Sequence, residues 1–413
     1  MINYHTHTLA NGLKVILHKD QTTPLVSLNI LYNVGSKHEK ENLTGFAHLF
    51  EHLMFGGSIH IPDYDTPLEK AGGENNAFTN QDFTNYYLTI PAINLETALW
   101  LESDRMLSLA FTQHSLDVQK KVVIEEFKER YLNKPYGDIY HIFYDMIFKT
   151  HPYKWPTIGK TPEHIEKATL DNVKDFFFSH YAPNNAILTL AGNIDYKKTL
   201  DLIEKWFGDI PRRDIAHNPI SKEPPQEKER RKTVYKNVPF SKIIIGYHMP
   251  ARTHKDYYVY DLLSDILANG RSARFFKNLI KPNTLFTKAD AYISGNIDTG
   301  IFYIDTLLKK EADPQEAEKN IYKELEKIIN GNISEEEINR MKNKYEVSYA
   351  FEMYELSSRS FYLSYYELLN DLSLINKEVE LYKQVTKQDI IRVAKELFSK
   401  ENRTVLYYLS KKY

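Results

Sequence analysis

The chain has 413 residues, of which 42% are hydrophobic and 26% are charged, and its formal net charge is only -2. This length exceeds one typical hydrophobic core and predicts at least two domains. The near-neutral charge argues against a protein that holds nucleic acid by its overall charge, and the hydrophobic fraction argues against a disordered acidic chain. Because the chain has no cysteine, any metal site must use His, Asp or Glu as ligands.

The sequence shows no membrane-spanning or targeting segment. No uncharged apolar run is long enough to cross a bilayer. The first residues lack a basic start followed by an apolar run of signal length, which predicts a cytoplasmic location, or a periplasmic one if a signal peptide has been removed. The aromatic load of 30 Tyr and 21 Phe indicates core packing or, alternatively, a surface that grips extended peptides.

The predicted elements alternate between strands and helices along the first half. Runs rich in Val, Ile and Leu predict strands, a glycine turn followed by alternating residues predicts a strand pair, and a threonine before an amphipathic run predicts a capped helix. In chain order these are strands at 13–20 and 25–36, a helix around 48–55, a strand pair at 71–90, helices over 94–149, a capped helix at 169–181 and a strand at 184–194.

A stretch rich in proline and charge, residues 216–232, is predicted to be a linker between two domains, 1–215 and 233–413. Beyond it the order of elements begins again, with strand-like runs at 241–250, 290–297 and 300–308 and a helical run at 257–270.

The two halves read as a diverged duplication. Thr169–Leu190 aligns without gaps with Thr386–Tyr407, each a capped helix, an aromatic residue, a turn asparagine and a strand. Two unrelated helix–strand units are the alternative. The prediction is an α+β fold of two similar domains, each a mostly antiparallel sheet packed with helices.

The chemistry-bearing motif is "HLFEH", which places His48 and His52 four residues apart with Glu51 before the second histidine. On a helix this spacing puts both imidazoles on one face, where they can bind one zinc ion. Glu51 lies at the rim of that face and is suited to act as a general base for hydrolysis. Two histidines satisfied by buried hydrogen bonds are the alternative. The second half has no copy of the motif and carries Asp261 and Asp265 at the roughly equivalent positions.

A third metal ligand must come from elsewhere, and "KKVVIEEFKER" offers Glu125, Glu126 and Glu129. The apolar residues around the first two predict a helix that enters the core. Spacing alone does not choose among the three glutamates, any of which could instead be a solvated surface charge.

These motifs, together with "TGFAHLFEHLMFGGS", "GGENNAFTNQDFTNYY", "HPYKWPTIG" and "NNAILTLAGNID", resemble those of the pitrilysin/insulinase family of zinc metallopeptidases. The family inverts the H-E-x-x-H order of other zinc peptidases, and the resemblance covers the first half closely and the second half loosely. It implies two α/β halves of similar topology, with four such units forming a clamshell around a closed chamber.

The resemblance also implies roles for individual residues. His48 and His52 would bind zinc together with Glu126, which ends "VVIEE", and Glu51 would be the base. A second group of residues, on an edge strand that pairs with the substrate peptide, would bind substrate: Asn76, Ala77 and Phe78.

Two positions depart from the family pattern. Gln119 stands seven residues before Glu126, where the family usually has a glutamate. Glutamine can still form hydrogen bonds but carries no charge, so its effect on the metal ligands differs from that of a glutamate. Ile280 and Thr287 stand where active members often carry an Arg and a Tyr that contact the substrate carbonyl. A homodimer, or a heterodimer with a related subunit that supplies this pair, would complete the chamber.

The sequence therefore predicts a zinc-dependent endopeptidase subunit that hydrolyses peptides or unfolded polypeptides, with Zn²⁺ as the cofactor and no nucleic-acid partner. Manganese and cobalt are compatible with the same ligands. The alternatives are a catalytically weak or non-catalytic scaffold and a peptide-binding subunit of such an assembly.

Overall fold

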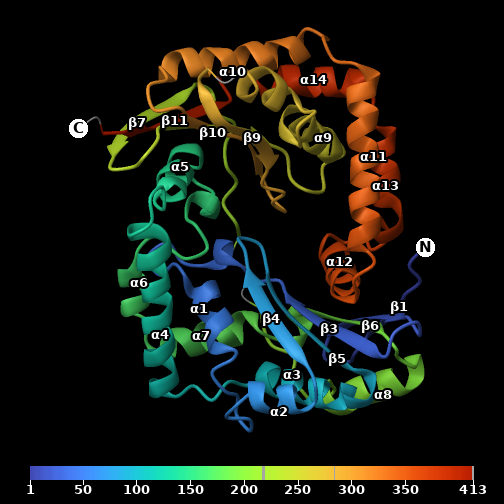
Figure 1. Ribbon diagram of the computed structural model, residues 1–413. Helices are drawn as coiled ribbons and strands as arrows, with labels where there is room; N and C mark the ends of the chain where they lie inside the picture. The colour runs from blue at the N-terminus through green and yellow to red at the C-terminus, as the bar shows by residue number, and fades with distance from the viewer. Residues whose placement is uncertain (216–218, 283, 412–413) are drawn as a thin grey trace. The chain divides into compact units, whose positions relative to one another are not determined.

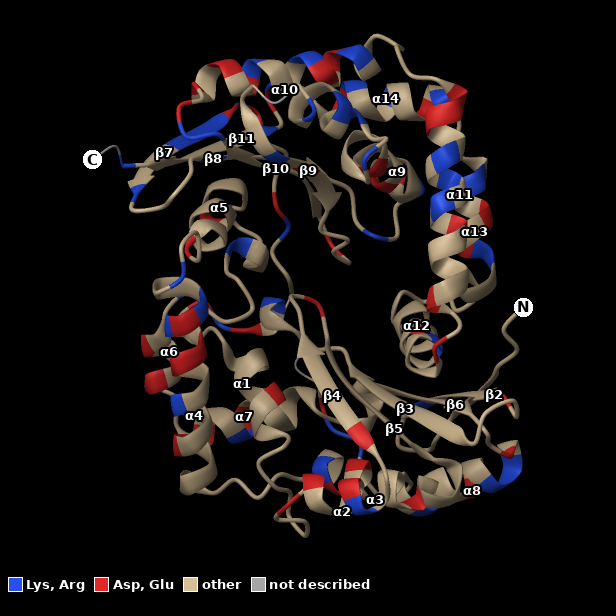
Figure 2. Ribbon diagram, in the orientation of Figure 1, with Lys and Arg blue, Asp and Glu red and all other residues tan. Residues whose placement is uncertain are grey.

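The computed structural model describes residues 1–215, 219–282 and 284–411 (Figure 1). Part of the predicted linker, residues 216–218, lies outside the described residues. Among the residues that are described, no helix is both long and apolar enough to cross a membrane. Figure 2 shows residues of both charges interspersed along the long helices.

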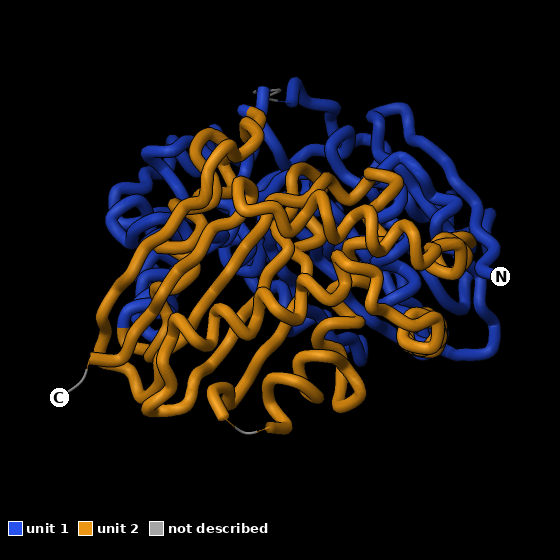
Figure 3. Tube along the Cα trace, turned by 90° about the horizontal axis from the view of Figure 1, so that it is seen from above, with its two compact units in different colours: residues 1–132, 155–221, 350–376 blue, residues 133–154, 222–349, 377–413 orange. Residues whose placement is uncertain are grey.

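Two compact units make up the chain, and each is assembled from three segments (Figure 3). Unit 1 comprises residues 1–132, 155–221 and 350–376. Unit 2 comprises residues 133–154, 222–349 and 377–413. The mixed α+β class with two helix-packed sheets is as predicted from the sequence.

Unit 1 is built on a six-stranded sheet of order β1-β2-β6-β3-β5-β4, in which only β2 and β6 run parallel. Its strands are β1 His5–Thr8, β2 Lys14–Lys19, β3 Leu25–Tyr32, β4 Glu74–Thr79, β5 Thr84–Pro91 and β6 Ala186–Gly192. The strand pair predicted after the glycine turn is the antiparallel pair β4–β5, and Gly72 in that turn has a φ of 72°, which glycine adopts readily. Strand β1 was not predicted, because its sequence HTHT is polar and fully exposed.

Helices and buried apolar side chains complete unit 1. The helices are α1 Phe46–Leu53, α2 Asp65–Lys70, α3 Leu95–Leu107, α4 Gln113–Phe127, α6 Pro162–Glu166, α7 Leu170–His180, α8 Tyr196–Phe207 and α12 Leu356–Leu368. A π-helical turn, Lys128–Leu132, continues α4. The helical stretch predicted over 94–149 is therefore interrupted, first after Leu107 and again after Leu132.

Unit 2 contains a five-stranded sheet of order β7-β11-β8-β10-β9, in which only β7 and β11 run parallel. Its strands are β7 Arg230–Lys236, β8 Lys242–Met249, β9 Phe286–Ile293, β10 Gly300–Leu308 and β11 Arg403–Ser410. The helices that lie wholly or mostly in unit 2 are α5 Ile139–Ile147, α9 Tyr257–Ala268, α10 Pro314–Ile329, α11 Glu335–Glu352, α13 Leu374–Gln384 and α14 Lys387–Leu397. Strand β7 begins inside the stretch predicted to be a linker.

The duplication predicted from the sequence is confirmed by the strand order, since β2-β6-β3-β5-β4 and β7-β11-β8-β10-β9 have the same sequence of parallel and antiparallel pairs. The aligned helices α7 and α14 both begin with a capping box, at Thr169 and at Thr386. The aligned turn residues also match: Asn185 donates to the carbonyl of His180, and Asn402 donates to that of Leu397.

Two helices pack on the sheet of the opposite half of the chain. Helix α12, from the second half, packs on β3 and β6 of unit 1 and is joined to them by buried polar contacts, including Ser27 to Ser360 at 2.9 Å between hydroxyl oxygens. Helix α5, from the first half, packs on unit 2, where the ring of Phe143 lies against Gly246, so closely that a Cβ there would be 2.6 Å from it. A single boundary between 1–215 and 233–413 therefore does not describe the compact units.

Candidate metal centre

Helix α1 presents His48 and His52 on one face and buries the other. Its buried residues, Phe46, Ala47, Leu49, Phe50 and Leu53, belong to the unit 1 core or pack beside it. The two histidine side chains are only 13% and 25% exposed. The i, i+4 spacing brings their ring centroids to 4.9 Å, so burial of one helix face orients both imidazoles together.

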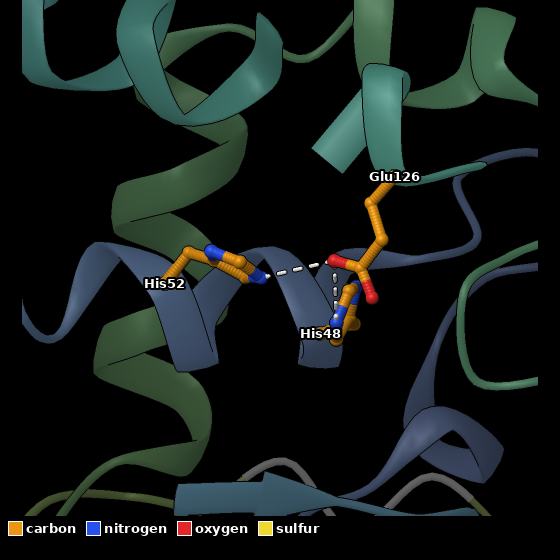
Figure 4. Close-up of side chains that lie close together, drawn as sticks. All are labelled: His48, His52 and Glu126. Atoms are coloured by element: carbon orange, nitrogen blue, oxygen red, sulfur yellow. Dashed lines mark ion pairs between the residues drawn. The ribbon is translucent and has the colours of Figure 1, made fainter. Parts of the chain in front are cut away.

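Glu126 of α4 completes this group (Figure 4). Its Oε2 lies 3.6 Å from Nε2 of His48 and 3.5 Å from Nε2 of His52. Among the described residues, His48, His52 and Glu126 form the one group of three or more His, Asp or Glu residues whose ligand atoms all lie within 4.8 Å of one another. Two imidazole nitrogens and one carboxylate oxygen are a donor set that zinc accepts, so the residues fit the ion that the motif implies.

The inner face of α4 explains why Glu126 is the glutamate in this group. The helix buries Leu116, Val123 and Phe127, and Glu126 lies at the edge of that buried face with 17% exposure. Glu125 is 65% exposed and pairs with Lys128 instead. The structure thus selects one of the three glutamates that the sequence left open.

The protonation states suit metal binding. Burial lowers the pKa of His48 to about 4, so this imidazole is neutral at pH 7 and can act as a ligand. A hydrogen bond with His52 and the charges on neighbouring groups hold the pKa of Glu126 below its usual value. The Nδ1 atom of His48 is buried and has no hydrogen-bond partner in the described part of the chain, so no second residue fixes its tautomer.

Arg130 is a residue of this centre that the sequence analysis missed. It lies in the π-helical turn after α4, and its Nη1 is 2.8 Å from Oε1 of Glu126. One carboxylate oxygen therefore faces the histidines while the other is held by the guanidinium. The i, i+4 spacing of "EFKER" is the signal that could have suggested this pair.

Glu51 lies outside the ligand group but close to it. Burial raises the pKa of Glu51, and the neighbouring Thr79 and His52 oppose that rise. A carboxyl group with a raised pKa beside a metal ligand is suited to accept a proton and return it. Thr79 is the last residue of β4, so Glu51 interacts both with the end of the edge strand and with the ligand His52.

The three predicted substrate-binding residues lie on β4, which is the edge strand of the sheet and pairs with β5 alone. The side chain of Asn76 accepts the backbone N–H of Ala77 at 2.8 Å. The ring of Phe78 packs against Phe83 and, from α12, against Phe361. An exposed strand edge of this kind can receive an extended peptide as an additional strand.

The remaining predicted positions are one residue of α4 in unit 1 and two residues of unit 2. Gln119 lines an open hollow of about 600 Å³ between α4 and the loop after α1, and none of the three candidate ligands lines it. In unit 2, Ile280 packs against the apolar core and Thr287 donates to the carbonyl of Leu308 at 3.4 Å. Neither side chain offers the positive charge or phenol that the resemblance associates with these positions.

The aspartates that replace the histidines in the second half serve other contacts. Asp261 accepts a hydrogen bond from Tyr382, and burial raises its pKa to about 6. Asp265 accepts one from Asn269. Neither belongs to a metal-binding group among the described residues.

Two family models and several curated relatives match this chain. The family described as insulinase, peptidase family M16, matches residues 14–144, and the domain described as peptidase M16 inactive domain matches residues 167–345. The zinc protease PqqE of Helicobacter pylori is 28% identical over 406 residues, which are 97% of this chain and 91% of that protein.

Solved structures with a similar fold include two bacterial proteases. A protease from Helicobacter pylori superimposes with a TM-score of 0.93 at 28% identity over the whole of both chains. The periplasmic protease PqqL from Escherichia coli shares the fold with a TM-score of 0.82 at 18% identity, and 99% of this chain matches 48% of that one. From both family matches and from these relatives, the chain belongs to the insulinase family of peptidases, family M16.

Proposed function

We propose that this protein is a zinc-dependent endopeptidase subunit that hydrolyses peptides or unfolded polypeptides. The observation that carries the proposal is the meeting of His48, His52 and Glu126 within one ligand sphere, with the partly buried Glu51 beside them. Its relatives are named zinc proteases, which supports zinc as the ion.

Different residues of the chain have different roles in the proposed hydrolysis. The three ligands hold the ion, which when bound supplies a Lewis acid that activates water and polarises the scissile carbonyl. Glu51 accepts the proton of the attacking water and returns it to the leaving amine, for which its raised pKa is suited. Strand β4 holds the peptide by backbone hydrogen bonds, which give affinity with little dependence on side-chain sequence.

A second chain completes the enzyme in this proposal, as a homodimer or as a heterodimer with a related subunit. Ile280 and Thr287 cannot stabilise an oxyanion as an Arg and a Tyr would, and the loss of one such donor typically costs about 2.7–4 kcal/mol of barrier. PqqL supports a paired arrangement, since this chain matches about half of its length. The partner would close the chamber and bring the missing donors.

A non-catalytic scaffold or peptide-binding subunit is the second candidate. It is favoured by the match of residues 167–345 to a domain described as inactive. It predicts peptide affinity without products, whereas the endopeptidase predicts turnover that depends on zinc.

The variant Glu51→Gln tests the proposal, because it keeps the size of the side chain and removes the base. The expected result is stoichiometric zinc by elemental analysis and a loss of peptide cleavage of about 10²–10⁴-fold, the usual contribution of a general base. A zinc-loaded variant that cuts peptides at the wild-type rate would show that Glu51 is not the base. Assays of the isolated chain and of the chain co-purified with its native partner separate the split site from a self-sufficient enzyme, since full activity of the isolated chain removes the need for a partner.

A further inference from the structure

The helix that carries both histidines lacks a cap of its own. The N-cap residue of α1 is Gly45, which has a φ of 90° and no side chain to accept the first N–H groups of the helix. Those groups would be left without partners inside the core, which is costly for a buried helix end.

Glu39 supplies the missing acceptor from outside the helix. Its Oε2 accepts the N–H of Gly45 and its Oε1 accepts the N–H of Ala47, both at 2.9 Å. Ala47 is the second residue of α1, the position that an ordinary N-cap side chain serves. A carboxyl group placed here also meets the positive end of the helix dipole.

The Glu39 side chain is enclosed, with the residue only 8% exposed. Burial raises its pKa, and the hydrogen bonds from Ala47, Gly45 and Trp155 oppose that rise by favouring the carboxylate. A carboxyl group buried to this extent requires partners for both oxygens, and the start of α1 supplies a main-chain donor to each.

The loop "HPYKWPTIG" contacts the start of α1 from the other side. This loop is one of the family-like motifs of the sequence, and the proposed mechanism does not use it. The indole of Trp155 donates to the carbonyl of Ser36 at 3.0 Å, three residues before Glu39. A Cβ at Gly45 would lie 2.7 Å from the carbonyl oxygen of Ile158, so backbone meets backbone at the helix start.

Thr44, the residue before the N-cap, is held by the same region. Its hydroxyl accepts the N–H of Lys160 at 2.8 Å, and its own N–H donates to Nδ1 of His164 at 3.1 Å. The entry of α1 is thus held by the 36–39 turn on one side and by residues 155–164 on the other.

His48 is the next residue after Ala47, so the first metal ligand stands in the turn of helix that Glu39 holds. Within the described part of the chain, no hydrogen-bond partner reaches the Nδ1 of this ligand. We propose that Glu39 is a positioning residue for the metal centre, holding the first turn of α1 so that His48 meets the ion together with His52 and Glu126. This inference rests on the metal role of His48 in the proposed function.

The variant Glu39→Gln tests it. The amide can accept only one of the two N–H groups and turns an N–H₂ toward the other. Residues that orient metal ligands typically contribute 10–100-fold to affinity, and we expect the zinc affinity of the full chain, measured by competition with a chromophoric chelator, to fall by about that factor. The visible absorption of the Co²⁺-loaded variant should also change, because the geometry around His48 changes.

Asp195→Ala is the matched control. Asp195 caps α8 in the same unit by accepting the N–H of Lys198 at 3.0 Å, and the described groups that act on it are lysines outside the metal centre. Loss of this cap should lower the unfolding midpoint of the metal-free protein and leave zinc affinity and the Co²⁺ spectrum at their wild-type values. A residue with a purely structural role behaves in this way.

The outcomes separate the inference from the function on which it rests. If wild type binds zinc, loses it on His48→Ala, and Glu39→Gln binds it as tightly as wild type with the same Co²⁺ spectrum, Glu39 does not position the ligands. If wild type binds no zinc through His48, the proposed function fails and the inference falls with it. Should Glu39→Gln not fold, Glu39→Asp replaces it with the same expectation, because the shorter side chain cannot reach both N–H groups.

Discussion

Replacing Glu126 by glutamine is the sharpest test of the metal centre. The change keeps the volume of the side chain and the apolar contacts of α4, and it removes the charge of the carboxylate whose Oε2 faces both histidines at 3.6 and 3.5 Å. Glu125 and Glu129 lie on the same segment and were equal candidates by spacing, so Glu125→Gln and Glu129→Gln are matched controls.

The expected loss follows from the share of one ligand in zinc binding. Apparent binding free energies of structural zinc sites are about 10–16 kcal/mol over four ligands, or roughly 2.5–4 kcal/mol for each. At about 1.4 kcal/mol for each tenfold change, Glu126→Gln should weaken zinc binding by about two to three orders of magnitude. Glu125 is 65% exposed and pairs with Lys128, so its replacement should leave the affinity unchanged.

Competition with a chromophoric chelator measures the three affinities under one set of conditions, and elemental analysis after dialysis gives the stoichiometry. Circular dichroism of the metal-free proteins confirms that α4 remains folded. The reasoning would be refuted if Glu126→Gln bound zinc like wild type, or if Glu125→Gln or Glu129→Gln lost as much affinity.

Three further predictions follow from other contacts. Arg130→Ala should raise the pKa of Glu126, seen by carboxyl ¹³C NMR of the metal-free protein, because it removes a cation 2.8 Å from Oε1, while stability should change by no more than about 1 kcal/mol; an unchanged pKa would contradict this. Arg105→Leu leaves the carboxylate of Glu102, which is 1% exposed, with the hydroxyl of Tyr64 but without its cation, and urea unfolding should show a loss of about 3–5 kcal/mol; a loss below about 1 kcal/mol would disprove the importance of the pair. Burial lowers the pKa of His38 from 6.5 to about 4, so the unfolded chain binds more protons than the folded chain between these pH values. The free energy of unfolding therefore falls as the pH drops through that window. In urea unfolding, His38→Gln should lose less stability than wild type between pH 7 and pH 5, and equal losses would contradict this prediction.

Local patterns were sufficient for most of the elements. The apolar runs of β2, β3, β6 and β8, the capped helices α7 and α14, and the glycine turn before β4 all follow from signals within a few residues. The polar strand β1 carried no such signal, because its pairing with β2 is a tertiary interaction.

The candidate site also contains residues that local sequence predicts and residues that it does not. The spacing of His48 and His52 is a property of one helix, so the sequence alone placed both imidazoles on one face. Glu126 could be named only by resemblance, since the choice among three glutamates depends on which face of α4 packs inward. Arg130 lies four positions from Glu126, and Glu39 lies six positions from Gly45, so both contacts are between near neighbours in the chain. The π-helical turn and the loop conformation that allow these contacts are visible only in the structure.

The sequence by itself determined the class of fold, the repeat and the pair of histidines, because each rests on periodicity or on contacts between near neighbours in the chain. Only the tertiary structure decided which helix covers which sheet, with α12 on the sheet of unit 1 and α5 on that of unit 2. The reason is that the hydrophobic effect does not depend on which part of the chain supplies the apolar surface. The sequence pattern shows that a helix face must be buried, but only the packed structure shows which sheet buries it.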